Sequence, residues 1–279
     1  MHAEYSIDQL CATLAVTRSG YHAWASRPPG PRARANAVLL PLIAQAHQAS
    51  RQTYGSPRVH RWLQQHDQSC GRHRVARLMR AAGLRSQARR RFRPLSLTDS
   101  HHDLPMAPNR LRGTAVPSQR DTVWVADITY VKTDEGFLYV AGVLDRCTRR
   151  CVGWAMSDSL ATTLPLAALD MALQQRRPPA GLVHHSDRGV QYASEAYRQK
   201  LAAAGVIPSM SRPGNCYDNA AMESFWSSLK RELVHRSQFA THAEARAAIF
   251  EWIEVFYNRE RLHSALGFHS PVDFETNSN

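Results

Sequence analysis

Three carboxylates have the residue type and the placement for one metal site. Asp127 lies inside the apolar run VWVADITYV, Asp187 closes LVHHSD, and Glu223 lies in NAAMESFWSSLKREL. The first two runs are typical of strands and the third of a helix. Two strand carboxylates and a helix carboxylate can converge at one end of a sheet, where oxygen ligands with open positions suit Mg²⁺ or Mn²⁺. Together they predict a divalent-cation site.

Each acid taken alone has a simpler interpretation. An unpaired carboxylate at Asp127 would cost several kcal/mol in mid-strand, so a structural salt bridge there is the plainer explanation. Asp187 precedes Arg188 and Gly189, a pattern typical of a turn. Glu223 alone is an ordinary solvated helix acid. Only their joint placement favours chemistry.

The segments that must position these acids predict an α/β fold. Strand-like runs at residues 122–133, 137–149 and 151–159 indicate three consecutive antiparallel strands. A helix, the short strand ending at Asp187, a second helix and a strand near residues 206–210 follow. This order, βββαβαβ, predicts a mixed sheet covered by helices. Beyond it come the helix holding Glu223 and a long helix from Thr241, where Thr241 and Glu244 form a capping-box pattern.

The basic charge is confined to the first part of the chain. The net charge is +12, and residues 1–113 hold 18 arginines and no lysine against five acids. An excess of this size favours a polyanionic partner such as nucleic acid. No apolar stretch reaches the ~18 residues of a membrane span and the start lacks signal-peptide features, so we expect no membrane association and a cytoplasmic location.

Two small helical units are expected in this basic part. Residues 6–27 have the spacing of a helix-turn-helix, and a second unit opens at an N-cap Ser56 followed by proline. After a break at Cys70-Gly71, residues 71–83 predict a helix with four mostly outward arginines that could lie against phosphates: Arg72, Arg74, Arg77 and Arg80. The alternative is a helical bundle with a merely soluble basic surface.

Three regions are therefore expected. Residues 1–85 form a basic helical, helix-turn-helix-like DNA-binding region, and residues 86–120 an extended linker rich in Pro and Arg. Residues 121–279 form the catalytic domain with its C-terminal helices. The linker begins with further candidate DNA contacts, which are Arg89, Arg90 and Arg91.

The motifs around the acids resemble those of a known superfamily. WVADITYV, HHSDRGVQY and NCYDNAAMESFWSSLKREL, with 35 residues between Asp187 and Glu223, resemble the Asp-Asp-Glu transposases and retroviral integrases, whose core is ribonuclease-H-like. More narrowly, YGSPRVHRWL, TDSHHDLPMAPN and YNRERLHSALGFHSPVDF resemble the second-reading-frame transposase of the insertion sequence 3 family. The resemblance covers almost the whole chain, and all three acids match.

The resemblance implies a reaction and its residues. Asp127, Asp187 and Glu223 would be both catalytic and metal-binding, holding two Mg²⁺ or Mn²⁺ ions for cleavage and strand transfer of DNA by in-line phosphoryl transfer. It also marks Lys230, seven residues beyond Glu223 and about two helical turns along the same face, as a DNA contact; an ordinary surface lysine is the alternative. No phosphate-loop motif occurs, so ATP is not expected.

The resemblance further implies partners. These are transposon-end and target DNA, further copies of the chain on that DNA, and the first-reading-frame product, as a fusion or a partner, because no heptad run precedes Tyr5. The implied location is the bacterial cytoplasm, in association with the nucleoid. Two rival functions stay open: a nuclease that only hydrolyses nucleic acid, and a DNA-binding regulator that has lost activity.

Other eye-catching residues have structural interpretations. For His184 and His185 a structural role is favoured over proton transfer or metal contact. Asp145 is expected to form a supporting salt bridge. The aromatic residues at helical spacing near the end of the chain are expected in the core: Trp226, Trp252, Phe256 and Tyr257.

Overall fold

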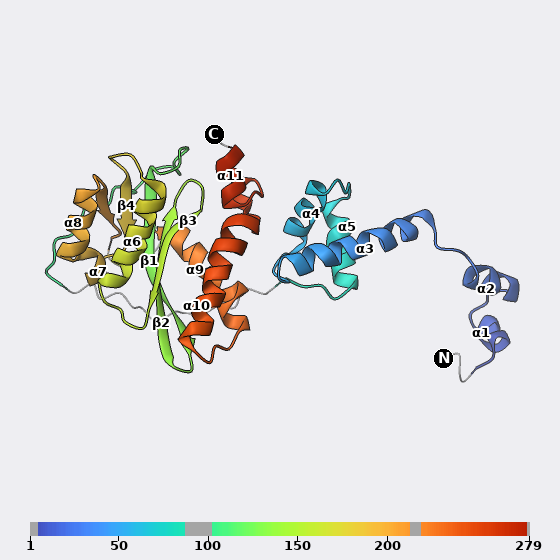
Figure 1. Cartoon of the computed structure of the whole chain (residues 1–279). Helices are drawn as coiled ribbons and strands as arrows, with labels where there is room; N and C mark the ends of the chain where they lie inside the picture. Colours follow the sequence, from blue (N-terminus) through green and yellow to red (C-terminus); the bar gives the residue numbers. More distant parts are fainter. Residues whose placement is uncertain (1–4, 87–101, 213–218, 278–279) are drawn as a thin grey trace. The chain divides into compact units, whose positions relative to one another are not determined.

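The computed structural model describes residues 5–86, 102–212 and 219–277 (Figure 1). Contacts divide the chain into two compact units. The helical unit consists of Met1–Ala49 and Gly55–Arg85, and the sheet unit of Ser50–Tyr54 and Ser86–Asn279.

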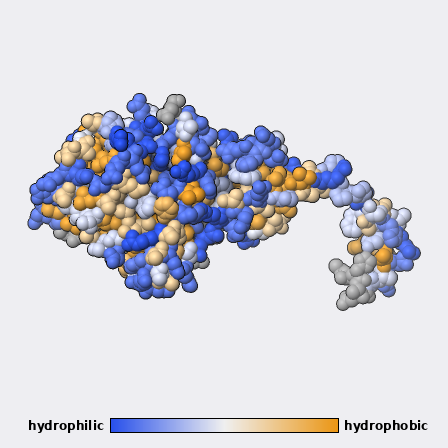
Figure 2. All heavy atoms as spheres, viewed as in Figure 1, coloured by the Kyte–Doolittle hydropathy of each residue, from blue (hydrophilic) through white to orange (hydrophobic). Residues whose placement is uncertain are grey.

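The helical unit begins with the predicted pair of short helices, α1 (Ile7–Thr13) and α2 (Arg18–Ala25). Ser6 and Gln9 form a reciprocal capping box at α1, and Thr17 accepts a hydrogen bond from an amide of α2. Of the described residues in this pair, only Cys11 is buried. Several large apolar side chains here and on the next helix are exposed: Tyr5, Leu14, Val16, Trp24 and Val38. Hydrophobic residues are visible on the surface of this N-terminal part (Figure 2).

The next helix, α3 (Pro31–Ala49), was not predicted from the sequence. Pro41 lies inside it, and an internal proline normally breaks a helix because it removes one backbone hydrogen bond. Burial of Leu39, Ile43 and Ala46 stabilises the helix through packing instead.

The second predicted helical unit is present with one shift in its start. Its first helix, α4 (Ser56–Gln65), takes Gly55 as N-cap, so Ser56 is the first helical residue and not the cap. Val59 and Leu63 are fully buried, as the apolar spacing predicted.

The basic helix of this unit is α5 (Arg72–Ala81), which buries Val75 and Met79. The chain leaves it through Gly83 at φ +69°, a left-handed conformation that favours glycine. The predicted break before the helix and the predicted stop after it are both confirmed.

The sheet unit is built on a five-stranded mixed sheet of order β3-β2-β1-β4-β5. The first three strands are antiparallel neighbours, while β4 runs parallel to β1 and β5 parallel to β4. This arrangement confirms the three predicted antiparallel strands and the predicted mixed sheet. The strands are β1 (Val123–Thr133), β2 (Gly136–Asp145), β3 (Cys151–Ser157), β4 (Val183–Ser186) and β5 (Ile207–Met210).

Helices cover both faces of this sheet (Figure 1). One face packs against α6 (Thr163–Arg176), α7 (Val190–Ala193) and α8 (Glu195–Ala203). The other packs against α9 (Ala220–Glu232), α10 (His242–Glu251) and the π-helix η3 (Trp252–Glu260), with α11 (Pro271–Asn277) beside η3. Short 3₁₀ turns lie at η2 (Val234–Arg236) and η4 (Ser264–Leu266). No helix in the described ranges combines the length and apolar character needed to cross a membrane.

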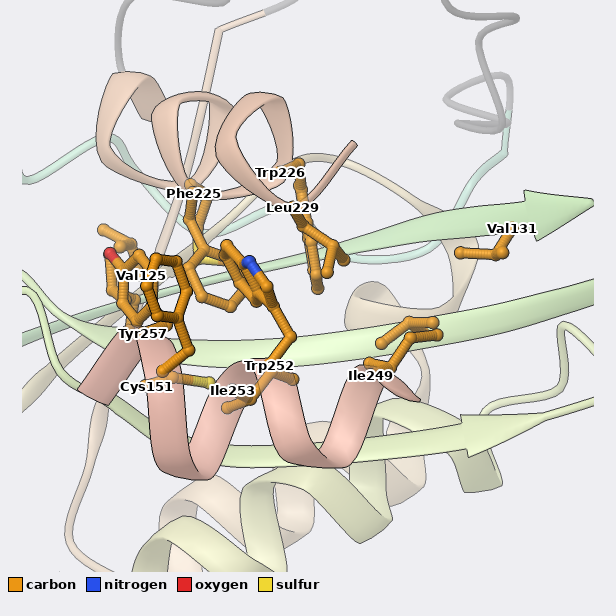
Figure 3. Close-up of a cluster of buried hydrophobic side chains, with 14 of the residues drawn as sticks. Val125, Val131, Cys151, Phe225, Trp226, Leu229, Ile249, Trp252, Ile253 and Tyr257 are labelled. Atoms are coloured by element: carbon orange, nitrogen blue, oxygen red, sulfur yellow. The ribbon is translucent and has the colours of Figure 1, made fainter. Parts of the chain in front are cut away.

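The α9 face holds the aromatic core predicted for the end of the chain. Phe225, Trp226 and Leu229 project from α9 toward Trp252 and Tyr257 of the π-helix (Figure 3). Phe225 meets the Tyr257 ring edge-on, with their centroids 4.7 Å apart. This packing fixes the helix that carries Glu223 on the sheet.

The N-terminal cap of α10 differs in detail from the prediction. Thr241 is the N-cap of α10, and its hydroxyl accepts from Glu244 N at 3.1 Å, as expected. The Glu244 carboxylate accepts instead from Ala240 N at 2.9 Å, one residue before the position that a complete capping box requires.

The described part of the predicted linker, residues 102–120, is not a free spacer. It contains no helix or strand, as expected, but it packs along the sheet unit. Leu111 is buried in the α9-side core, and Arg110 N donates to Ser209 Oγ of β5 at 2.9 Å. A non-periodic segment can thus still bury scattered apolar residues, as Leu111 shows.

A five-residue segment, Ser50–Tyr54, also belongs to the sheet unit. The Tyr54 hydroxyl accepts from Leu262 N at 2.7 Å and donates to Glu260 O at 3.4 Å, which closes the end of the π-helix. The Arg51 guanidinium forms a two-pronged ion pair with Glu251 and lies 4.5 Å from the Phe256 ring centroid.

Candidate active site

Asp127 and Asp187 lie where two parallel strands separate. The last paired residues of β1 and β4 are Val125 and His185. Each aspartate is two residues further along the chain, Asp127 within β1 and Asp187 directly after the end of β4. Since side chains two apart share a face, both carboxylates continue the same side of the sheet at its carboxyl end. The backbone N–H of Gly189 donates to Asp187 Oδ1 at 2.9 Å and fixes the turn that follows.

The alternation along β1 turns Asp127 toward α9. Val125 and Val131 belong to the α9-side core, whereas Trp124 and Ala126 belong to the α6-side core. Asp127 shares the parity of the first pair, so its carboxylate faces the helix that carries Glu223.

The three acids are coupled electrostatically. Burial raises the pKa of Asp127 well above its usual range, and the negative charges of Asp187 and then Glu223 raise it further. The Ile128 backbone N–H opposes this rise. The indole N–H of Trp226 also favours the ionised form, although it makes no full hydrogen bond to any described residue. Asp127 nevertheless keeps an intermediate surface exposure, so solvent reaches one side of it.

Glu223 lies in the first turn of α9 with an exposed side chain. The helix can approach the sheet closely because residue 142 of β2, opposite Asp127, is glycine. A Cβ atom there would lie 3.0 Å from the Trp226 ring and 3.3 Å from Met222 Cε. Gly142, which the sequence interpretation did not single out, therefore sets how near Glu223 comes to the strand acids.

Lys230 is placed beside the same acids. Its Nζ lies 4.9 Å from the Tyr130 ring centroid, and Tyr130 follows Asp127 on β1. Burial lowers the pKa of Lys230, and the charge of Asp127 partly opposes this. A half-buried ammonium held over an aromatic ring is unlike the freely solvated surface lysine that was the alternative.

The acid cluster fits a divalent cation by charge and donor type. Carboxylate oxygens are the ligands that Mg²⁺ and Mn²⁺ prefer, and a cation would relieve the repulsion that raises the pKa of Asp127. Within residues 5–86, 102–212 and 219–277, no three His, Cys, Asp or Glu side chains already gather tightly enough to hold a metal. Asp187 is held by the hydrogen bond from Gly189 N, whereas the Glu223 side chain is exposed to solvent.

The predicted basic contacts differ among themselves. Arg72, Arg77 and Arg80 are exposed on α5. Arg74 is half-buried, and its Nε donates to Asn36 Oδ1 of α3 at 2.8 Å, so it stabilises the helical unit and is not an open contact. The remaining candidates lie outside the described residues: Arg89, Arg90 and Arg91.

The two histidines next to Asp187 have structural contacts, as favoured from the sequence. His185 Nδ1 lies 2.8 Å from Ser209 Oγ and its Nε2 3.0 Å from Ser211 Oγ, so both ring nitrogens are occupied. His184 Nε2 lies 3.0 Å from the Tyr197 hydroxyl. Burial and the neighbouring His185 lower the pKa of His184 to about 3, so it stays neutral.

The salt bridge expected at Asp145 was the wrong interaction. Its fully buried carboxylate accepts three backbone hydrogen bonds, from Asp121 at 2.6 Å, Cys147 at 2.9 Å and Thr148 at 2.8 Å. The nearby Arg176 pairs with Asp121 and Glu275 instead. Asp145 thus closes the β2–β3 turn and takes no part in the acid cluster.

A separate cavity of about 200 Å³ lies on the α8 side of the sheet, between Pro105 and Pro108 of the 102–120 stretch and Tyr197 and Leu201 of α8. Asp127, Asp187 and Glu223 do not line it.

The fold and this geometry agree with comparisons to known families. Two family models, each described as an integrase core domain, match residues 117–216 and 204–271. A third, described as an HTH-like domain, matches residues 33–92 and so spans α3 to α5. The ribonuclease-H-like core expected from the sequence, preceded by small helical units, is thereby confirmed.

Curated relatives resemble nearly the whole chain. The insertion element IS600 uncharacterized 31 kDa protein of Shigella sonnei is 46% identical over 265 residues, which cover 95% of this chain and 97% of that protein. Transposase InsF for insertion sequence IS3A of Escherichia coli (strain K12) is 39% identical over 275 residues, 98% of this chain and 95% of that protein.

Among solved structures, a chain of the simian T-cell lymphotropic virus intasome, determined with PP2A regulatory subunit B56 gamma, is similar with a TM-score of 0.48 at 12% identity. The match covers 83% of this chain and 73% of that one.

The two curated relatives are both over 30% identical to this chain and matched nearly end to end. The chain therefore belongs to the insertion sequence 3 family of transposases.

Proposed function

We propose that this chain breaks and joins DNA at the ends of an insertion sequence, with Asp127, Asp187 and Glu223 as its catalytic carboxylates. The observation that supports the proposal is the placement of Asp127 and Asp187 where β1 and β4 separate, with Glu223 in the first turn of α9, which packs on that face of the sheet. Burial and then the negative charges of Asp187 and Glu223 raise the pKa of Asp127, and a bound cation would offset this concentration of negative charge.

The same acids would hold two divalent cations, Mg²⁺ or Mn²⁺. Such ions supply activation of the attacking hydroxyl or water and stabilisation of the leaving oxygen in an in-line displacement. The chain's own contribution is placement: the strands fix Asp127 and Asp187, and α9 delivers Glu223 from the opposite side. No protein nucleophile is required.

DNA contacts are proposed at two places. Lys230, half-buried beside Asp127, would hold a phosphate next to the acids. In the helical unit, the exposed Arg72, Arg77 and Arg80 of α5 would contact the backbone of the duplex, with further contacts from Arg89, Arg90 and Arg91. This assigns DNA binding to residues 1–85, catalysis to residues 121–279 and a linking role to residues 86–120.

Assembly follows from the reaction. Joining two DNA ends requires at least two end-binding sites, so we propose that several copies of the chain act together on DNA. The product of a first reading frame, as a fusion or a separate partner, is proposed to add further end recognition.

The direct test supplies the full chain, with and without a first-reading-frame product, with labelled element ends and Mg²⁺. Wild type is expected to cleave and join the ends. D127A should do neither and still bind, while the matched exposed-acid variant D158A should behave as wild type. Cleavage without any joining would favour a nuclease, and binding without cleavage by the wild type would favour a regulator.

A further inference from the structure

On the side of β1 that faces β4, one backbone carbonyl lies beyond the last β1–β4 pair and accepts no hydrogen bond from β4. Thr122 O accepts from Val183 N next to β4, and Val123 O accepts from Arg146 N on the β2 side. Carbonyls alternate between the two neighbours along a strand, so Ala126 O faces the β4 side. The last β1–β4 pair is at Val125, and Ala126 O is left beyond it.

The side-chain amide of Asn219 donates to this carbonyl in place of a strand N–H. Asn219 Nδ2 donates to Ala126 O at 3.1 Å, and only 7% of Asn219 is exposed. Asn219 stands at the N-cap of α9, yet its side chain makes no capping bond to the helix. It therefore ties the start of α9 to β1 in the gap between the two strand aspartates.

The carbonyl oxygen of the same amide is buried and accepts no hydrogen bond from the described residues. Asn219 Oδ1 has no hydrogen-bond partner among the described residues. Buried amide oxygens are normally satisfied, and an exception points to a functional role or to a water or ion that supplies the donor. Asn219 adjoins Asp127 through Ala126 and precedes Glu223 by one helical turn, so this free acceptor borders the acid cluster.

A hydrated divalent cation offers the missing donor. Mg²⁺ gives up its waters reluctantly and keeps several of them when carboxylates bind it. Those waters point their hydrogens outward, so the wall of the site must supply acceptors. Resting on the proposed function, we propose that Asn219 is a positioning residue whose Oδ1 accepts a hydrogen bond from a water of the cation held by Asp127, Asp187 and Glu223, while its Nδ2 holds α9 to β1.

The chain contains a matched control for this role. Asn258, on the π-helix, is also buried, and its amide is fully paired: Cys151 N donates to Oδ1 and Nδ2 donates to Cys151 O, both at 3.0 Å. The two asparagines have the same side chain, the same depth and a hydrogen bond to a strand backbone. Only Asn219 has an unused acceptor.

The experiment measures the unfolding midpoint of the full chain, without DNA, during titration with MnCl₂ or MgCl₂. Wild type should be stabilised by the cation. N219A should raise the apparent cation dissociation constant by roughly 10-fold or more, as loss of an outer-sphere partner typically does. N258A should lower the cation-free midpoint and leave the dissociation constant unchanged.

A second variant separates the two arms of Asn219. N219D keeps an acceptor oxygen and loses the amide donor to Ala126, so it should lower the cation-free midpoint yet bind the cation at least as well as wild type. If N219A fails to fold, a weaker cation response in N219D overturns the proposal. If N219A binds the cation as wild type does, Asn219 is only structural. If wild type itself shows no response, the proposed cation site fails, and the role of Asn219 fails with it.

Discussion

Asp127 and Gly142 face each other across the β1–β2 ladder, and the absence of a side chain at Gly142 leaves room for Trp226. An added Cβ would lie 3.0 Å from Trp226 Cη2, tighter than most real contacts. Because the ring is anchored in the aromatic core, the helix and not the ring must give way.

The variant G142A should therefore be destabilised by about 1–3 kcal/mol, the usual effect of overpacking a core. It should also lose strand-transfer activity, since Met222 and Glu223 move with the helix. Urea unfolding and an end-joining assay measure the two effects. G30A is the matched control, because nothing lies within 4 Å of a Cβ at Gly30. Wild-type stability with wild-type activity in G142A would contradict the close approach.

The raised pKa of Asp127 predicts a pH-dependent stability in the cation-free protein. A carboxyl whose folded pKa lies above its unfolded value of ~4 stabilises the fold while protonated, and this contribution is lost as pH rises through the folded pKa. D127N cannot ionise, so it should lack this fall in the free energy of unfolding. Denaturation of both proteins in a chelating buffer, at pH values between the unfolded pKa and the folded pKa of Asp127, tests whether the free energy of unfolding falls as pH rises.

Cation binding should have the opposite pH dependence. The carboxylate must be ionised to act as a ligand, so the affinity of wild type for Mn²⁺ should rise with pH over the same window. D127N should bind weakly at every pH. For the cation-free proteins, a free energy of unfolding that rises with pH equally in wild type and D127N would contradict the predicted effect of the raised Asp127 pKa.

Lys230 is expected to contribute one phosphate contact. K230A should weaken binding to all DNA sequences similarly and reduce the slope of log affinity against log salt by about 0.9. Fluorescence anisotropy at several salt concentrations measures this slope. K200A is the control, because Lys200 forms a surface ion pair with Asp170 on the far side of the sheet. An unchanged slope in K230A would remove Lys230 from the DNA surface.

The neighbouring arginines of α5 should separate into two behaviours. R77A removes an exposed charge and should weaken DNA binding with little change in stability. R74A breaks the hydrogen bond to Asn36 and should lower the stability of the helical unit by about 1.5–3 kcal/mol. Thermal unfolding beside anisotropy distinguishes them, and equal loss of stability in both would contradict the assignment.

Periodicity and motif spacing predicted much of the sheet unit. The apolar alternation around Asp127 and the turn after Asp187 mark strand positions, and the packing of α9 followed from its apolar face. Helix α3 was missed because Pro41 argues locally against a helix, and tertiary burial overrides that preference. The contact between Asn219 and Ala126 O could not be predicted. It depends on the residue at which β4 separates from β1, and no sequence pattern indicates that residue.

The Ser50–Tyr54 segment has a practical consequence for dissecting this protein. A fragment that begins after Arg85 would retain every strand and all three acids but lack Tyr54, whose hydroxyl binds Leu262 N and Glu260 O. It would also leave Glu251 and Phe256 without Arg51. The sheet unit is thus discontinuous in sequence, and a fragment meant to preserve its contacts must include the short peptide that lies between α3 and α4 in the chain.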